Sequence, residues 1–128
     1  PPRSTLFPYT TLFRSIYVDR FGASKADFAL VAEVEQKIVG AVWVRIIHDY
    51  GHIDDETPSL AISLYKEYRG QGIGTDMMKE TLSLLKTHGY KRVSLSVQKA
   101  NYAAEMYRKI GFDIVRGNEE EWIMVCNL

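Results

Sequence analysis

The chain has 128 residues, of which 46% are hydrophobic and 25% are charged, so it holds enough apolar material for one globular core. Its 16 basic and 16 acidic residues cancel, and no surplus of charge points to nucleic acid or a membrane surface as an obligatory partner. No apolar run approaches the roughly 18 residues that a membrane-spanning helix needs. The single Cys126 excludes an intrachain disulfide and favours a reducing cytoplasm; we expect it to act as a small hydrophobe in a final strand.

The first fifteen residues differ from the rest of the chain. Pro1–Ser15 shows no amphipathic period, no helix cap and no secretory signal. Within it, Thr5–Ser15 (TLFPYTTLFRS) resembles the conceptual translation of a sequencing adapter. We therefore predict that residues 1–15 are a non-native extension with few tertiary contacts, apart from a chance strand match by the β-prone Thr10–Phe13, and that residues 16–128 form a single domain. Ile16–Phe21 fits the end of a helix but is too short to assign.

Two β-rich segments come next. Phe28–Val34 and Ile38–Ile47 are separated by the hairpin-length gap Glu35–Lys37, which predicts two antiparallel strands. Gly40 opens the second strand and predicts either a bulge or a close approach of two backbones. The polar, acidic stretch His48–Pro58 is predicted to be a loop.

The middle of the chain alternates strand and helix. Ser59–Tyr65 has the near alternation of apolar and polar residues that is typical of a strand. Asp76–His88 carries apolar residues at helical spacing and ends at Gly89. Val93–Val97 alternates strictly and predicts another strand. Because a helix separates the two strands, we expect them to be parallel neighbours joined by a right-handed crossover.

The last third repeats this pattern and then closes the sheet. Asn101 is a favourable N-cap for a helix over Tyr102–Ile110. Ile114–Val115 and Trp122–Val125 are predicted to be closing strands joined by a turn. The order of three strands, helix, strand, helix and two strands predicts an α/β (α+β) domain whose mixed sheet has helices on its faces.

A glycine-rich stretch, Arg69–Thr75 (RGQGIGT), connects the strand Ser59–Tyr65 to its helix. Such a turn directs unpaired backbone N–H groups and the positive end of the helix dipole at one spot, where an anion is favoured. Thr75 excludes two other phosphate-binding motifs. A nucleotide P-loop needs a lysine directly after Gly74, and the dinucleotide fingerprint needs a third glycine at the same position, so neither motif is present. The pattern R/Q-x-x-G-x-G/A is met by Arg69, Gly72 and Gly74, and a tight turn without a ligand is the alternative.

This turn resembles the coenzyme A pyrophosphate loop of the GNAT superfamily of N-acetyltransferases. A second stretch resembles another signature of that family, and both occur in the family's order. The matching residues of the second stretch are Asn101, Ala104, Tyr107, Gly111 and Phe112. The resemblance covers Phe28–Leu128, about four fifths of the chain.

The resemblance implies a mixed, mostly antiparallel sheet with a central parallel strand pair and flanking helices. It also implies transfer of an acetyl group from acetyl-coenzyme A to the amine of a small molecule or a peptide, without a metal. A homodimer is left open. Two departures stand out: the family's N-terminal strand and helices, which form one wall of the acceptor groove, are missing or replaced here, and Lys66 stands where the family often has proline.

The resemblance also assigns donor-binding residues. In this family the backbone N–H groups of Gln71–Thr75 bind the pyrophosphate, the segment Ile62–Leu64 pairs with the pantetheine arm, and an N–H near Leu64 polarises the thioester carbonyl. The alternative for the side chains of Ile62 and Leu64 is core packing, and Arg69 either neutralises a phosphate or caps a carbonyl. The predicted donor-binding residues are Ile62, Ser63, Leu64, Arg69, Gly70, Gln71, Gly72, Ile73, Gly74, Thr75 and Asn101.

The leaving thiolate needs a proton, and Tyr107 is the predicted general acid. A thiol has a pKa of about 8.5 and a phenol of about 10, so the transfer is uphill by roughly two kcal/mol in water. It becomes feasible where burial destabilises the thiolate, or where the hydroxyl donates a hydrogen bond to developing charge. The alternative is that Tyr107 is an amphipathic core residue.

The base is less defined by the sequence. Its candidates share the polar loop before the strand Ser59–Tyr65. They are His48, His52, Asp54, Asp55 and Glu56. Their spacing matches no common metal site, so acceptor recognition, a base acting through water, or a solvated loop are the interpretations. For the whole chain, two alternatives to catalysis are a coenzyme A-binding module without activity and a nucleotide-binding α/β domain.

Overall fold

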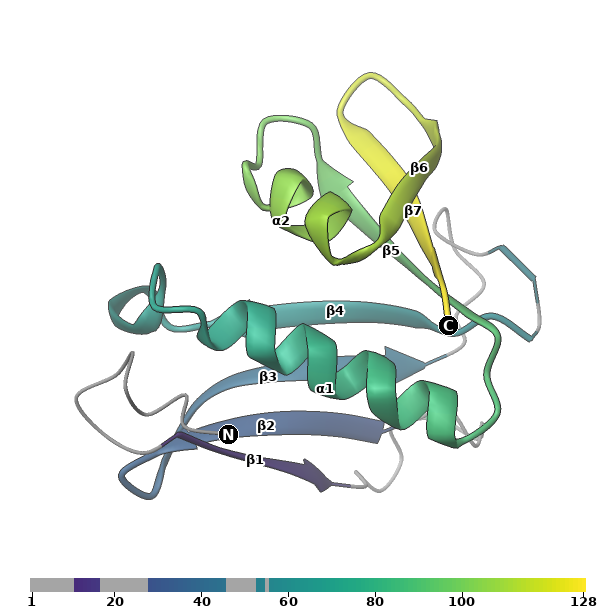
Figure 1. Cartoon of the computed structure of the whole chain (residues 1–128). Coiled ribbons are helices and arrows are strands. Elements are labelled where there is room, and N and C mark those ends of the chain that lie inside the picture. Colours follow the sequence, from purple (N-terminus) through teal and green to yellow (C-terminus); the bar gives the residue numbers. More distant parts are fainter. Residues whose placement is uncertain (1–10, 17–27, 46–52, 55) are drawn as a thin grey trace.

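The computed structural model describes residues 11–16, 28–45, 53–54 and 56–128. They form one sheet in the order β1-β2-β3-β4-β5-β7-β6, with two α-helices (Figure 1). The strands are β1 (Thr11–Ile16), β2 (Phe28–Val34), β3 (Lys37–Arg45), β4 (Ser59–Leu64), β5 (Arg92–Gln98), β6 (Phe112–Gly117) and β7 (Glu121–Asn127). The helices are the 3-10 helix η2 (Lys66–Tyr68), α1 (Ile73–Thr87) and α2 (Ala103–Ile110).

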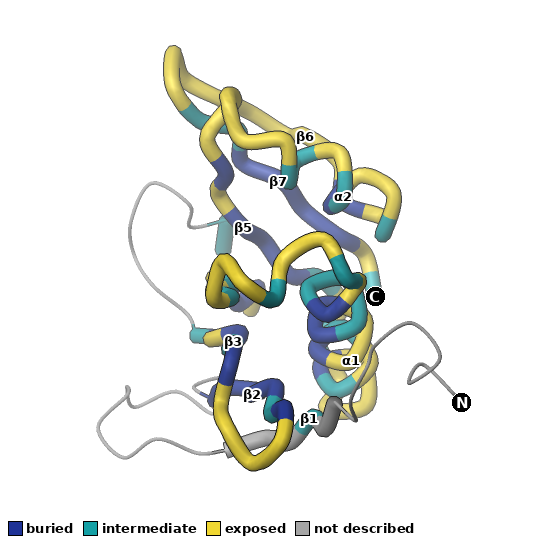
Figure 2. The backbone as a smooth tube through the Cα atoms, turned by 90° about the vertical axis from the view of Figure 1, so that its left-hand side faces the viewer, coloured by how far each residue is buried: buried dark blue, intermediate teal, exposed yellow. Residues whose placement is uncertain are grey.

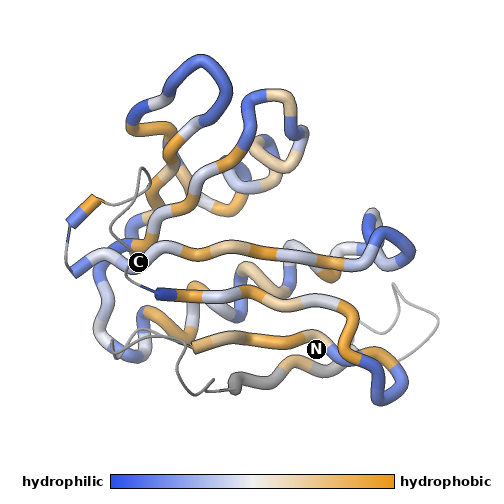
Figure 3. Tube along the Cα trace, turned by 180° about the vertical axis from the view of Figure 1, so that it is seen from behind, coloured by the Kyte–Doolittle hydropathy of each residue, from blue (hydrophilic) through white to orange (hydrophobic). Residues whose placement is uncertain are grey.

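All neighbouring strands of this sheet pair antiparallel except β4 and β5, which are parallel and lie at its centre. The predicted fold class, a mixed, mostly antiparallel sheet with a central parallel pair and flanking helices, is therefore confirmed. The strands carry most of the hydrophobic residues and the connecting turns are hydrophilic (Figure 3). Neither described helix is long and apolar enough to cross a membrane.

The predicted hairpin forms between β2 and β3. Glu35 and Gln36 at its turn both have positive φ, 50° and 69°, which gives a two-residue turn the twist that antiparallel strands require. Gly40 shows both predicted features: the register skips Val39, and a Cβ at Gly40 would lie 2.9 Å from the Ser63 carbonyl oxygen. Glycine at this position thus lets β3 and β4 approach each other.

The core lies between the sheet and the two helices. Helix α1 packs on β2 and β3 through side chains spaced three or four residues apart, and Figure 2 shows the buried side of α1 turned toward these strands. Its fully buried members are Ile73, Met77, Met78, Thr81 and Leu85. Helix α2 packs on β5 and β6, where Tyr107 meets Phe112.

The parallel pair is short. Its one register pair is Ser59↔Ser94, next to a hydrogen bond of 3.0 Å from the Ser94 N–H to the Pro58 carbonyl. Beyond this point β4 and β5 diverge, as Figure 1 shows. The sheet therefore consists of two halves, β1 to β4 and β5-β7-β6, which separate toward the carboxyl end of β4.

The amino-terminal segment requires a correction. Thr11–Ile16 forms β1, which pairs with β2 without interruption from Thr11↔Val34 to Ile16↔Ala29. Phe13 packs against the hydrophobic core. The expectation of few tertiary contacts is therefore wrong for residues 11–15, because the edge of β2 offers unpaired backbone groups and the alternation of a strand places Phe13 over apolar side chains.

Residues 11–16 thus form the edge strand of the sheet, next to β2. The origin of that segment as a non-native extension stays a prediction. Ile16 ends a strand and not a helix, and the rest of Ile16–Phe21 lies outside the described residues, as do residues 1–10.

Candidate functional site

The glycine turn follows β4 through η2 and enters α1. Gly70 and Gly72 have φ values of 76° and 86°, in the left-handed region that favours glycine. The Arg69 Nε–H donates a hydrogen bond of 3.1 Å to the Leu64 carbonyl, so Arg69 takes the carbonyl-capping alternative. Gln71 Nε2 donates to the Glu67 carbonyl at 3.2 Å. The two side chains tie the turn to the end of β4 and to η2.

The first turn of α1 lies inside the glycine motif, three residues before the predicted start at Asp76. Gly72 is its N-cap, and the Asp76 N–H donates to the Gly72 carbonyl at 3.0 Å. The N–H groups of Ile73, Gly74 and Thr75 precede that bond and have no intrahelical acceptor. Together with the positive end of the helix dipole, they favour an anion at this position.

The edge of β4 that faces β5 supplies further backbone donors. The Tyr65 N–H bonds to the Val39 carbonyl on β3 at 2.9 Å. Because hydrogen-bonded pairs alternate along antiparallel strands, Ser63 also bonds toward β3, whereas Ile62 and Leu64 direct their N–H groups to the opposite edge. There β5 has diverged, so these N–H groups face the gap between the two halves of the sheet.

A cavity of about 390 Å³ fills this gap. Its walls come from the end of β4, the glycine turn and the start of α2. The lining residues predicted from the sequence are Ile62, Ser63, Leu64, Arg69, Gly70, Gly72, Gly74, Thr75 and Asn101. Thus two stretches that are distant in the sequence and were identified by separate motifs border one space.

Two predicted residues do not line the cavity. Ile73 is fully buried in the core. The side chain of Gln71 folds back toward η2, where its Oε1 is buried without a hydrogen-bond partner. In the sequence-based assignment these residues contribute backbone N–H groups, which is compatible with either side-chain position.

The sequence analysis missed Tyr102, Ala103 and Met106, which also line the cavity. Tyr102 is 82% exposed. The spacing of these residues puts them on one side of α2, next to Asn101, and that periodicity was the available signal. Asn101 lies one residue before Tyr102, the N-cap of α2, and its Oδ1 accepts the Ala103 N–H at 2.9 Å, so it satisfies one donor of the helix start from outside the predicted cap position.

Tyr107 lies on α2 but does not line the cavity. It is buried, and its ring centroid lies 6.1 Å from that of Phe112. Burial raises the pKa of the Tyr107 phenol, so the hydroxyl keeps its proton at neutral pH. The ring has the packing of a core residue, and the role of the hydroxyl as an acid stays a prediction.

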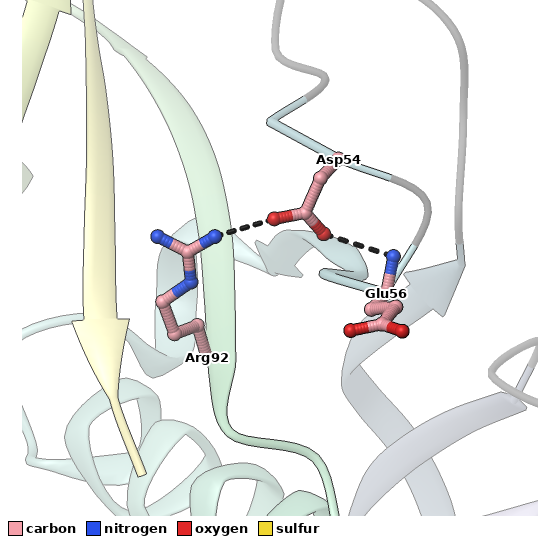
Figure 4. A network of polar contacts seen from close by, with 3 residues as sticks. All are labelled: Asp54, Glu56 and Arg92. Atoms are coloured by element: carbon pink, nitrogen blue, oxygen red, sulfur yellow. Dashed lines mark hydrogen bonds and ion pairs between the residues drawn. The ribbon is translucent and has the colours of Figure 1, made fainter.

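The candidate bases lie elsewhere or outside the described residues. Asp54 forms an ion pair with Arg92 and accepts the Glu56 N–H at 2.8 Å (Figure 4). A hydrogen bond from the Thr57 side chain lowers the pKa of Asp54, and the Glu56 N–H and Arg92 lower it further. This network precedes β4, so about 20 Å of extended chain separates it from the glycine turn.

His48, His52 and Asp55 lie outside the described residues. In the part of the chain that the structure describes, no three histidine, cysteine or acidic side chains gather in a way that would hold a metal ion.

Comparisons with known proteins agree with this geometry. Residues 3–112 match the family model described as the acetyltransferase (GNAT) family. The chain is 33% identical over 101 residues to N-alpha-acetyltransferase 30 of Schizosaccharomyces pombe, and 31% identical over 83 residues to the probable N-acetyltransferase camello of Xenopus laevis. These alignments cover 77% and 64% of this chain, but only 66% and 36% of the relatives.

A solved structure shows the same fold. The PaiA N-acetyltransferase of Thermoplasma acidophilum, determined in complex with coenzyme A, superposes with a TM-score of 0.67. The sequence identity is 22%, and the match covers 78% of this chain and 60% of that protein.

Proposed function

The chain belongs to the acetyltransferase (GNAT) family, and we propose that it transfers an acetyl group from acetyl-coenzyme A to a primary amine. The observation that carries this proposal is the cavity at the start of α1, bordered by both motifs and by the stretch of β4 whose β5-facing edge is unpaired. The complex of the PaiA acetyltransferase with coenzyme A supports the choice of donor.

In the proposed complex, the pyrophosphate accepts hydrogen bonds from the backbone of the glycine turn and the first turn of α1. The positive φ values of Gly70 and Gly72 expose these N–H groups, and no side-chain charge is needed to hold the anion. The pantetheine arm then continues along β4 and pairs with the N–H groups of Ile62 and Leu64, much as a further strand would.

The chemistry follows from this placement. The Leu64 N–H donates a hydrogen bond to the thioester carbonyl oxygen and stabilises the negative charge that develops there when the amine attacks. The C–N bond forms, the C–S bond breaks, and the departing thiolate takes a proton while the amine loses one. Tyr107 is our proposed proton donor, because its phenol is protonated at neutral pH and Ala103, one turn earlier on α2, lines the cavity. The burial that raises its pKa weakens the phenol as an acid, so the hydroxyl acts by donating a hydrogen bond to the developing thiolate.

The acceptor belongs to the class of primary amines, in small molecules or peptides. Since one relative is an N-alpha-acetyltransferase, peptides with a free α-amino group come first in a test panel. A cytoplasmic location stays a prediction based on the single, buried Cys126.

The test is release of free coenzyme A thiol from acetyl-coenzyme A in the presence of such amines. We expect amine-dependent release by the wild-type chain and none by the Gly72→Glu variant. Release that does not depend on added amine, or that survives in the variant, would contradict the proposal.

A second function, a coenzyme A-binding module without catalysis, is favoured by one observation: Tyr107 does not line the cavity, and the candidate bases that the structure describes lie at the far end of β4. Coenzyme A binding without thiol release from any amine would support this module. A nucleotide-binding α/β domain is disfavoured, because Thr75 replaces the lysine of a P-loop.

A further inference from the structure

The two halves of the sheet meet at a single junction. Within β1 to β4 and within β5-β7-β6, neighbouring strands pair along most of their length, with a bulge at Val39 and another at Val115, whereas β4 and β5 share only the register pair Ser59↔Ser94. Helix α1 packs on the first half and α2 on the second. The cavity is lined from both halves, so its width depends on how the halves are held at this junction and where α1 meets α2.

The junction contains a buried pair of hydroxyl groups. Ser59 Oγ and Ser94 Oγ are 2.9 Å apart, and the two residues are only 8% and 0% exposed. A buried hydroxyl that loses its partner carries its full desolvation cost, so the pair favours one separation of the strands. A strand pair held only by apolar packing would not fix that separation as narrowly.

An ion pair braces the same end of the strands. Arg92 lies two residues before Ser94 on β5 and pairs with Asp54, which precedes β4 (Figure 4). Both side chains are 41% exposed, so solvent screens the pair and its contribution is smaller than that of the buried hydroxyls.

We propose that Ser59 and Ser94 are positioning residues that set the separation of β4 and β5, and thereby the fit of the donor's pantetheine arm. This inference rests on the proposed function, in which that arm lies along β4. Leu64 is five residues from the junction, about 16 Å along the strand, so a rotation of about 4° at the junction moves it by about 1 Å. A misplacement of that size near a reacting group can cost about 10²-fold in rate.

The test compares two ligands in binding to wild-type protein and to the Ser59→Ala/Ser94→Ala double variant, which removes both partners of this hydrogen bond together. Coenzyme A contains the pantetheine arm, whereas adenosine 3′-phosphate 5′-diphosphate keeps the pyrophosphate and lacks the arm. We expect the Kd of coenzyme A to rise about tenfold, equivalent to the loss of one hydrogen bond between β4 and the pantetheine arm, while the Kd of the nucleotide stays within about twofold. Equal shifts for both ligands, or no shift for either, would overturn the inference.

Two further variants control for stability. Thr81→Val removes an equally buried hydroxyl, which bonds to the Met77 carbonyl within α1, and should leave the ratio of the two Kd values unchanged. If the double variant does not fold, Asp54→Asn serves in its place, because it weakens the partly exposed Asp54–Arg92 ion pair. It should raise the Kd of coenzyme A by about twofold and leave the Kd of the nucleotide unchanged. An unchanged ratio in that variant counts against the junction's role. Amine-dependent thiol release by the wild-type chain tests the proposed function separately, so the two claims fail by different results.

Discussion

The two ends of β4 are built in opposite ways. At its amino end, which we call the closed end, side chains join it to β5 through the Ser59–Ser94 hydroxyl pair and the Asp54–Arg92 ion pair. At its carboxyl end, which we call the open end, β4 and β5 have parted. The groups that face the gap there are backbone N–H donors of β4 and of the first turn of α1. In our proposal, this site therefore binds with its backbone, and side chains that do not line the cavity hold its shape.

The largest expected effect lies at the open end. Gly72→Glu places a carboxylate where the pyrophosphate is proposed to bind and puts a side chain on a residue with φ of 86°, so acetyl-coenzyme A affinity should fall by about 100-fold or more. Calorimetry measures this. Gly89→Glu is the matched control, since Gly89 also has positive φ, 89°, but lies past the other end of α1; equal losses in both variants would contradict the loop assignment.

Tyr107→Phe is expected to have the next largest effect. It removes one hydroxyl and little packing, so turnover should fall by about 10- to 10⁴-fold while donor affinity is nearly intact. Steady-state rates across pH measure the first and calorimetry the second. Tyr65→Phe, at an exposed tyrosine outside the cavity lining, is the control. Wild-type turnover in Tyr107→Phe would make Tyr107 a core residue only.

The edge strand β1 sharpens the comparison, because it too is held by backbone pairing. Phe13→Ala should lower the free energy of unfolding by about 1 to 3 kcal/mol, since Phe13 packs against the core. Thermal or urea unfolding checks this. An unchanged stability would restore the sequence-based expectation that residues 1–15 contribute little.

The smallest expected effect concerns pH at the closed end. The pKa of Asp54 is lowered, first by the Thr57 hydrogen bond, so the ionised carboxylate stabilises the fold above its ordinary pKa of 3.8. That contribution is lost as the pH falls through the lowered value. Urea unfolding of wild type and Asp54→Asn should therefore differ slightly at neutral pH and converge in strong acid; a difference that persists there would show that the ionised carboxylate is not its cause.

The turn geometry of the open end could be predicted from the sequence and the contacts of the closed end could not, for a physical reason. Backbone binding depends on glycine at positions of positive φ and on a helix start, and both appear as a short local pattern in Arg69–Thr75. The Ser59–Ser94 pair joins residues 35 positions apart, and no local pattern marks either serine as buried or bonded.

The same argument explains the remaining differences. The pairing of β1 with β2 was foreseen only as a chance match, because adapter-like residues were excluded on their presumed origin, although a strand edge accepts any β-prone segment of suitable register. The position of Tyr102 in the cavity lining was missed because site residues near α2 were chosen from the family motif and not from the helical periodicity around Asn101. By contrast, the bulge and the close backbone approach at Gly40 were predicted correctly, because few other physical causes place a glycine inside a strand.

Amide hydrogen exchange along β4 tests the central claim most directly. In the free protein, the Ser63 N–H should exchange slowly because it bonds to β3, and the N–H groups of Ile62 and Leu64 should exchange fast because they face the gap. Saturating coenzyme A should slow Ile62 and Leu64 and leave Ser63 unchanged. Slow exchange at all three residues before ligand is added, or no change at Ile62 and Leu64 with coenzyme A bound, would contradict the account.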